Sequence, residues 1–266
     1  MKIASTKLVY FSPTQTTRRI LEVIAQGVGA DNIEHLDLTP PEARTRAFVE
    51  IDNQLTIIGV PVYGGRVPQE AIHRLQRLKA LRTPAVVVVL YGNRAYEDAL
   101  LELRDLAIGL GFTPLAAGAF IGEHSYSNET IPIASGRPDQ DDLRKAREFG
   151  RKIEKKLEKL HGLHEVPPLT VPGKFPYKER GTARKLPPES LQILCTRCGS
   201  CVTVCPTATI TIGDSVVTDA TFCISCCACV KNCPTKARVV VDPGIQERAG
   251  KMSKTCAERK EPEFYL

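Results

Sequence analysis

Short apolar runs alternate with amphipathic stretches along the first 160 residues of the chain. Five runs are rich in branched or aromatic side chains and have the length of buried strands, at residues 8–11, 33–38, 55–60, 85–90 and 115–121. Apolar residues recur at helical spacing after the first, third, fourth and fifth runs, and the last of these stretches spans residues 139–160. Strands that alternate with helices are typical of a doubly wound sheet. We therefore predict an α/β domain over residues 1–160 with five parallel strands.

Polar or glycine-bearing loops follow three of the predicted strands. Residues 12–17 carry Ser and Thr ahead of a helix, residues 61–68 carry two glycines beside a tyrosine, and residues 91–96 begin and end with tyrosine. A helix N-terminus with hydroxyl side chains binds anions, and glycine lets a flat ligand approach the backbone. In the strand order 2-1-3-4-5 the three loops meet at one edge of the sheet, where such folds bind ligands. Taken alone, the first loop also fits a plain helix N-cap.

The first loop resembles the phosphate loop of flavodoxins, whose pattern is S/T-x-T-G-x-T. Ser12, Thr14 and Thr17 match this pattern, whereas Gln15 stands where the family has glycine. The resemblance implies that FMN binds with its phosphate at residues 12–17 and its ring between the other two loops, where tyrosines would stack on it. The cofactor-binding residues that it implies are Ser12, Thr14, Gln15, Thr16, Thr17, Pro61, Val62, Tyr63, Gly64, Gly65, Tyr91, Gly92, Asn93, Arg94 and Tyr96.

Residues 195–234 hold two copies of one cysteine pattern, C-x2-C-x2-C-x3-C-P, placed 28 residues apart. The pattern is typical of bacterial-type ferredoxins with two [4Fe–4S] clusters, in which the fourth cysteine of each run binds the other cluster. A disulfide framework would need an oxidising compartment, and a zinc ribbon would need two separated cysteine pairs. The predicted ligands are Cys195, Cys198, Cys201 and Cys233 for one cluster, and Cys205, Cys223, Cys226 and Cys229 for the other.

One residue departs from the symmetry of the two runs. Cys227 takes the place in the second run that Gly199 holds in the first. It is either a spare sulfur ligand or a small residue accepted in a glycine position.

The remaining segments complete a two-domain arrangement. We place a small α+β ferredoxin domain at residues 191–241, with a hairpin over 208–219. Residues 161–190 contain six prolines and are predicted to be a semi-stiff basic linker, whose charged side chains are solvated or meet an acidic redox partner. Residues 242–266 form a tail to which the sequence assigns no element. The basic residues of the linker are Lys174, Lys178, Arg180, Arg184 and Lys185.

The composition is that of a soluble globular protein, with 42% hydrophobic and 25% charged residues. A formal net charge of +6, spread evenly along the chain, does not favour nucleic acid as a partner. No apolar stretch has the roughly 18 residues of a membrane helix, and residues 1–6 lack the apolar core of a signal peptide. We therefore expect a cytoplasmic protein with reduced cysteines.

Through these loops and cysteine runs, the whole chain resembles fused flavodoxin-like and ferredoxin proteins of anaerobic bacteria and archaea. Such a protein is expected to pass electrons between two [4Fe–4S] clusters and FMN, and so to connect one-electron with two-electron partners. The expected partners are redox proteins, such as a ferredoxin or an oxidoreductase, and a homodimer is compatible with the sequence.

Two other functions fit the same sequence. A reductase would pass a hydride from reduced FMN to a small molecule and would need a proton donor, for which His124 and Tyr96 are the candidates. His124 also fits an ordinary surface loop histidine. A redox sensor would respond to oxidant through its clusters or through Cys227. The chain carries no G-x-G-x-x-G fingerprint for a nicotinamide dinucleotide.

Overall fold

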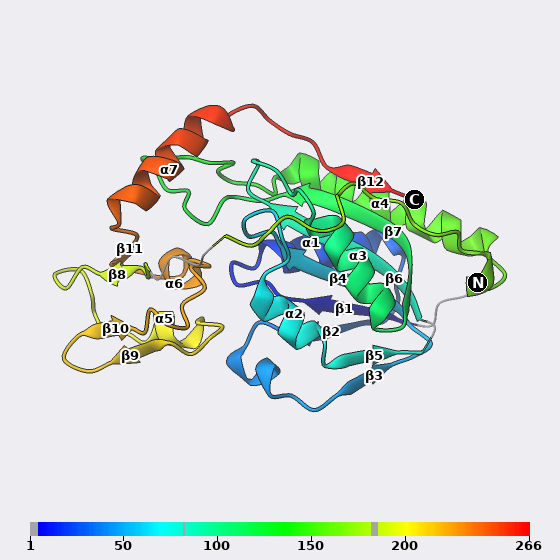
Figure 1. Cartoon of the computed structure of the whole chain (residues 1–266), viewed down its shortest axis with the longest axis horizontal. Helices are drawn as coiled ribbons and strands as arrows, with labels where there is room; N and C mark the ends of the chain where they lie inside the picture. Colours follow the sequence, from blue (N-terminus) through cyan, green and yellow to red (C-terminus); the bar gives the residue numbers. More distant parts are fainter. Residues whose placement is uncertain (1–4, 82, 182–185) are drawn as a thin grey trace.

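A six-stranded sheet forms the centre of the part of the chain that the computed structural model describes, which is residues 5–81, 83–181 and 186–266 (Figure 1). Its strand order is β12-β7-β6-β4-β1-β2. Five strands are parallel and follow the predicted order 2-1-3-4-5, so the predicted doubly wound fold is confirmed. These strands are β1 (Thr6–Tyr10), β2 (Ile33–Asp37), β4 (Leu55–Pro61), β6 (Thr83–Tyr91) and β7 (Phe112–Ile121).

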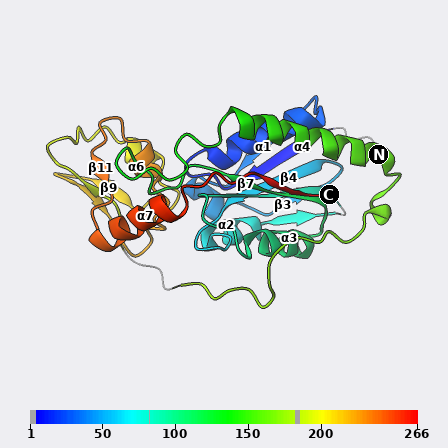
Figure 2. The same ribbon diagram turned by 90° about the horizontal axis from the view of Figure 1, so that it is seen from above.

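Helices cover both faces of this sheet, which explains why its central strands are continuous apolar runs. Every residue of β6 is buried. One face carries α1 (Thr16–Val28) and α4 (Gln140–Lys159), and the other carries α2 (Gln69–Leu75) and α3 (Ala99–Gly109) (Figure 2). The carboxyl ends of β1, β4 and β6 therefore meet at one edge between two apolar cores.

The apolar residues Ala71, Ile72, Leu75 and Leu78 follow helical spacing and predict that the helix after the third strand reaches Leu78. Helix α2 instead ends at Leu75, and Leu78 lies in β5 (Leu78–Ala80). This short strand pairs in parallel with β3 (Val49–Ile51), which follows a 3₁₀ turn, η1 (Pro41–Arg44). The error arises because the pairing with β3 is non-local and leaves no trace in the spacing of residues 69–78.

The C-terminal tail, to which the sequence assigns no element, forms helix α7 (Pro243–Thr255) and strand β12 (Glu263–Tyr265). β12 adds a sixth, antiparallel strand to the edge of the sheet beside β7. Phe264 anchors it by stacking on Phe149 of α4, with the ring centroids 4.6 Å apart. The start of α7 carries a signal that sequence reasoning missed, because Asp242 caps the helix and a proline follows at its first position.

The cysteine-rich segment folds into short elements around its two cysteine runs. The predicted hairpin over 208–219 is present as β9 (Ile210–Ile212) and β10 (Val216–Thr218). A second small sheet joins the two ends of the segment. Its strands are β8 (Glu189–Ser190) and β11 (Arg238–Val239), and the short helices are α5 (Ser200–Thr203) and α6 (Ala228–Lys231).

Polar contacts hold the cysteine-rich segment against the carboxyl edge of the main sheet. The fully buried guanidinium of Arg74 donates a hydrogen bond to the backbone oxygen of Pro206, at 2.5 Å. The ammonium of Lys231 donates to the Glu123 carboxylate at 2.5 Å and to the backbone oxygen of Ser127 at 2.7 Å. The segment therefore lies over the end of the sheet where ligands of this fold bind.

The predicted linker packs along the first domain, after a 3₁₀ turn, η2 (Leu163–Glu165). The backbone N–H groups of Lys174 and Lys178 both donate to the Asp98 carboxylate. Arg180 forms an ion pair with the buried Glu102 of α3, at 2.6 Å. The charged side chains of Lys178 and Arg180 are thus paired within the chain and Lys174 is exposed, whereas Arg184 and Lys185 lie outside the described residues.

Gly150 offers a test of the close contact between α4 and α1. A Cβ at Gly150 would lie 2.2 Å from the backbone oxygen of Ile24. Alanine normally stabilises a helix interior by about 1 kcal/mol over glycine, but we expect Gly150→Ala to lower the free energy of unfolding by about 1–3 kcal/mol. Gly250 of α7 meets open space, so Gly250→Ala should raise it instead. Urea denaturation measures both, and a stabilising effect of Gly150→Ala would contradict the contact.

Candidate functional site

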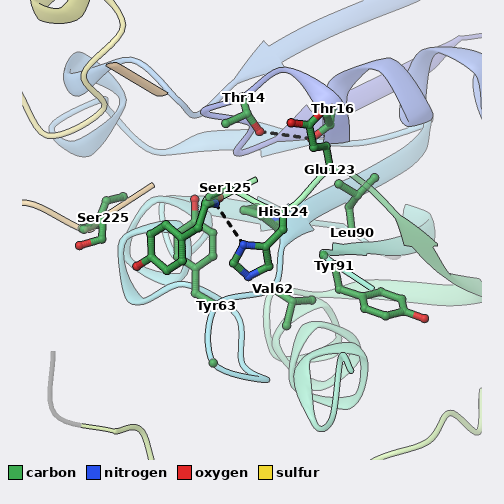
Figure 3. Close-up of a pocket in the computed structure, with 15 residues that line it drawn as sticks. Thr14, Thr16, Val62, Tyr63, Leu90, Tyr91, Glu123, His124, Ser125 and Ser225 are labelled. Carbon is green, nitrogen blue, oxygen red and sulfur yellow. Dashed lines mark hydrogen bonds between the residues drawn. The ribbon is translucent and has the colours of Figure 1, made fainter. Parts of the chain in front are cut away.

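A cavity opens at the carboxyl ends of β1, β4 and β6, and we call it the sheet-edge cavity (Figure 3). It encloses about 720 Å³ including its mouth. The three predicted loops contribute to its wall, as do the loop after β7 and the cysteine-rich segment. The lining residues are Thr14, Thr16, Pro61, Val62, Tyr63, Gly64, Leu90, Tyr91, Gly92, Glu123, His124, Ser125, Tyr126, Ile224 and Ser225.

The loop over residues 12–17 has the shape of an anion-binding loop although Gln15 replaces glycine. Gln15 adopts the left-handed backbone conformation, with φ 63°, and its side-chain amide donates to the backbone oxygen of Ser12 at 3.1 Å. The Ser12 hydroxyl accepts the Arg18 N–H at 3.1 Å. This conformation costs a non-glycine residue about 1–2 kcal/mol, which the surrounding hydrogen bonds offset. Gln15 therefore adopts a left-handed backbone conformation that glycine would adopt without strain.

The start of α1 turns donors toward the sheet-edge cavity. The hydroxyls of Thr14 and Thr16 lie 3.3 Å apart at its wall (Figure 3). The first N–H groups of a helix have no acceptor within the helix and carry the positive end of its dipole. The buried side chains of Ser12 and Thr17 support the loop from behind. This end of the cavity suits a phosphate group.

The three candidate tyrosines are placed differently. Tyr63 lines the sheet-edge cavity. The ring of Tyr91 points away from His124 and packs on Tyr96, with the centroids 5.3 Å apart (Figure 3). The Tyr96 hydroxyl donates to the Glu263 carboxylate of β12 at 2.8 Å, and burial raises its pKa far above the usual value. Tyr96 is therefore outside the cavity and does not fit the role of proton donor.

Two further predicted residues, Asn93 and Arg94, do not line the sheet-edge cavity. Asn93 is buried, and its amide donates to the backbone oxygens of Cys256 and Glu258 at 2.7 and 2.8 Å. Arg94 pairs with Glu97 at 2.6 Å and lines a neighbouring cavity together with Gly65. The 91–96 loop is thus fixed from outside by the C-terminal tail.

Tyr126 lines the sheet-edge cavity but was not among the predicted cofactor residues. Burial raises its pKa to about 12. The signal was present in the sequence, because the loop after the fifth strand also starts at the carboxyl edge of the sheet.

His124 lies in the middle of this wall (Figure 3). Its Nδ1 accepts the N–H of Tyr126 at 3.1 Å. Burial, followed by the nearby charges of Lys231 and Arg94, lowers its pKa to about 4. The imidazole is therefore neutral at pH 7 and carries its proton on Nε2. It can donate a hydrogen bond to a ligand, but at this pH it cannot act as the imidazolium proton donor that the reductase hypothesis requires.

The eight cysteines of the two runs surround two separate cavities. All ten cysteines are free. The distal cavity, of about 290 Å³, is lined by Cys195, Cys198, Cys201 and Cys233. The proximal cavity, of about 310 Å³, is lined by Cys205, Cys223, Cys226 and Cys229. The structure thus brings together the same two sets of four that the spacing predicts.

Each set of sulfurs encloses a volume and does not converge on a point. Within the described residues, no three Cys, His, Asp or Glu side chains are close enough to share one metal ion. Burial raises the pKa of Cys226 to about 12, so a thiolate there needs compensating positive charge. A multinuclear iron–sulfur cluster supplies both the size and the charge that these cavities require.

Arg238 lies between the two cavities. Its buried guanidinium donates to the Cys229 sulfur of the proximal set at 3.8 Å, and the residue also lines the distal cavity. Its Nε has no hydrogen-bond partner within the described residues. A buried cation with an unused donor at this position suits two anionic clusters.

Cys227 takes up the conformation of the glycine that it replaces. Its φ is 59°, compared with 84° for Gly199, and each residue caps a short helix. The thiol is buried, lines the proximal cavity and contacts the backbone oxygen of Ser225 at 3.6 Å. The backbone of Cys227 is thus that of a glycine position, while its sulfur remains beside the cluster ligands.

Comparisons with known proteins support these assignments in part. Residues 189–256 match the family described as a 4Fe-4S dicluster domain. No curated protein matches the chain.

Solved structures similar to the chain were also found. An archaeal flavodoxin is 12% identical, with 58% of this chain and 99% of that chain covered and a TM-score of 0.37. A Fusobacterium nucleatum flavodoxin bound to flavin mononucleotide is 14% identical, with 57% and 98% covered and a TM-score of 0.39. An apo NADH:FMN oxidoreductase is 16% identical, with 59% and 92% covered and a TM-score of 0.44.

The family match includes every cysteine of the two runs. The chain joins a flavodoxin-like domain to a 4Fe–4S dicluster domain. The first assignment rests on the strand order 2-1-3-4-5, and the second on the matched family. The match to the dicluster domain continues through α7, beyond residue 241 where the sequence prediction ends the small domain. Among the described helices of the chain, none has the length and apolar character to cross a bilayer.

The depressed pKa of His124 has a consequence for the stability of the flavodoxin-like domain. The pKa of this histidine is about 6.5 in the unfolded chain and about 4 in the folded protein, so the folded protein takes up the proton only at lower pH. The free energy of unfolding should therefore fall by about 2 kcal/mol from this residue alone between pH 6.5 and 5. His124→Gln should remove that part of the loss. Urea denaturation at stepped pH measures it, and identical losses in both proteins would contradict the buried neutral imidazole.

Arg238 should raise the reduction potential of the dicluster domain, because its buried charge stabilises the more negative reduced state. We expect Arg238→Gln to lower the midpoint potential by about 60 mV, equivalent to a tenfold change in the one-electron equilibrium. Arg197 also lines the distal cavity but is exposed, so Arg197→Gln should have a much smaller effect. Redox titration followed by electron paramagnetic resonance measures both, and equal shifts would contradict the role of burial.

Proposed function

We propose that the protein passes electrons between two [4Fe–4S] clusters and FMN held in one chain, and so converts between one-electron and two-electron redox partners. The observation that carries this proposal is a shared wall. Ile224 lines both the proximal cavity and the sheet-edge cavity, and it is flanked in the sequence by Cys223 and Ser225. A cluster on the proximal cysteines and a flavin in the sheet-edge cavity would thus be neighbours.

Different segments of the chain would bind the phosphate and the ring of FMN. The loop at residues 12–17 and the first turn of α1 would bind the phosphate, through N–H groups and threonine hydroxyls. Tyr63 and Tyr126 would line the ring, and the neutral His124 would offer a hydrogen-bond donor at its Nε2. The glycine at position 92 leaves room for this imidazole, because a Cβ there would lie 2.4 Å from His124 Cδ2. When bound, FMN accepts one or two electrons, whereas each cluster passes one.

The surface around the distal cavity suits the docking of a redox protein. Cys198 is exposed, whereas Cys226 of the proximal set is buried. Ile193, beside the first cluster ligand, is 95% exposed, and Leu194 and Val202 are also exposed. Apolar side chains at a surface with the nearby cation Arg197 favour an acidic partner such as a ferredoxin. Electrons would then enter at the distal cluster and leave through the flavin, or follow the reverse path.

A reductase of a small molecule is the second candidate, and one observation favours it. The sheet-edge cavity shares lining residues with a second cavity, among them Val62, Gly64 and His124. An acceptor bound in this second cavity would lie next to the wall of the flavin site, and none of the eight cysteines of the two runs lines it. Because the lowered pKa of His124 keeps it neutral at pH 7, His124 does not supply the proton that such a reaction needs.

The relay is tested by removing one proximal ligand. Anaerobically purified protein should contain about eight iron atoms and one FMN per chain. Cys223→Ala should slow flavin reduction by a chemically reduced ferredoxin at least a hundredfold in rapid mixing, while FMN stays bound. Cys256→Ala is the matched control, since Cys256 lines neither cavity, and its rate should be unchanged. Flavin reduction at the wild-type rate in Cys223→Ala would rule out the relay.

A further inference from the structure

A second cavity adjoins the sheet-edge cavity on the side away from the cysteines, and we call it the basic cavity. It encloses about 1100 Å³ including its mouth. Both cavities are lined by Val62, Gly64, Tyr91, Gly92 and His124, so a ligand in one would contact the wall of the other.

Positive charge dominates the basic cavity. Four cations line it, Arg94, Lys178, Arg248 and Lys251, and no carboxylate does so within the described residues. Glu97 pairs with Arg94 at 2.6 Å and with Lys178 at 2.5 Å, and it lies outside the lining. Across residues 5–81, 83–181 and 186–266, neither Arg248 nor Lys251 takes part in an ion pair. Two of the four cations thus share the single carboxylate of Glu97, and the other two are free for a ligand.

The two free cations lie on one face of α7. Arg248, Lys251, Met252 and Thr255 follow the three- and four-residue spacing of a helix face, and all four line the basic cavity. The helix is fixed at its C-terminal end, because Asn93 binds the backbone oxygen of Cys256 and the Ser253 hydroxyl donates to the backbone oxygen of Pro132. The tail therefore holds this face toward the cavity, so the cations need little reorganisation to bind a ligand.

We propose that the basic cavity binds an anionic small molecule, a carboxylate or a phosphate ester, beside the flavin. Arg248 and Lys251 would hold the anionic group, and the Nε2–H of His124 would donate to the part of the ligand that enters the shared wall. The anion site rests on the charges of the cavity alone. Only its place next to a flavin rests on the proposed function.

Titration calorimetry on the full-length protein loaded with iron and FMN tests the site, with inorganic pyrophosphate and succinate as probes. We expect at least one probe to bind saturably at a stoichiometry of one. Arg248→Ala and Lys251→Ala should each weaken that binding at least fivefold. Lys254→Ala is the matched control, because Lys254 lies on the same helix outside the cavity lining, and it should change binding by less than twofold.

The outcomes distinguish the two ligand sources and the two proposals. Binding of pyrophosphate alone would assign the site to phosphate esters, binding of succinate alone to carboxylates, and binding of both to either anion. Binding of neither probe, or equal weakening by Lys254→Ala and Lys251→Ala, would overturn the anion site. The flavin spectrum of each sample shows independently whether the protein takes up FMN. Protein that binds the probe but cannot be loaded with FMN would sink the proposed function and leave the anion site standing.

Discussion

The hydrogen bonds of one buried guanidinium connect the two halves of this molecule. Arg74 of α2 is fully buried and donates to the backbone oxygens of Leu38, Thr39 and Pro40 in the flavodoxin-like domain. It also donates to the backbone oxygen of Pro206, the residue after Cys205 of the proximal cavity. Glu70 balances its charge at 2.9 Å. Loss of this side chain would leave several buried carbonyl groups unpaired, at a cost of about 1–3 kcal/mol each.

This constraint decides where the proximal cysteines lie. The Pro206 contact fixes the end of the first cysteine run, while Lys231 fixes the second run through Glu123. Ile224 then forms the common wall of the proximal and sheet-edge cavities. The C-terminal tail also contacts the flavodoxin-like domain, because Asn93 donates to the backbone oxygen of Cys256 and β12 pairs with β7. The tail thus holds one loop of the sheet-edge cavity from outside without lining the cavity itself.

Sequence patterns formed by residues close together in the chain predicted the strands of the main sheet and the grouping of the cysteines. The alternation of buried strands with amphipathic stretches predicted the doubly wound sheet, and its strand order came from the flavodoxin-like fold that the chain resembles. The two cysteine runs predicted the same two sets of four that surround the cavities. Contacts between residues that are distant in the sequence could not be predicted from it. The pairing of Leu78 with β3 and the docking of Phe264 on Phe149 depend on residues far away in the sequence. The protonation state of His124 likewise depends on burial and on Lys231 of the other domain.

The central claim is that clusters and flavin exchange electrons within one polypeptide. Flash reduction of the flavin, followed by absorbance at the flavin and cluster bands, measures how fast the electrons redistribute. The shared wall at Ile224 predicts a first-order rate that stays constant when the protein is diluted tenfold. A rate that falls in proportion to protein concentration would mean that the electrons move only between molecules, and would contradict the account.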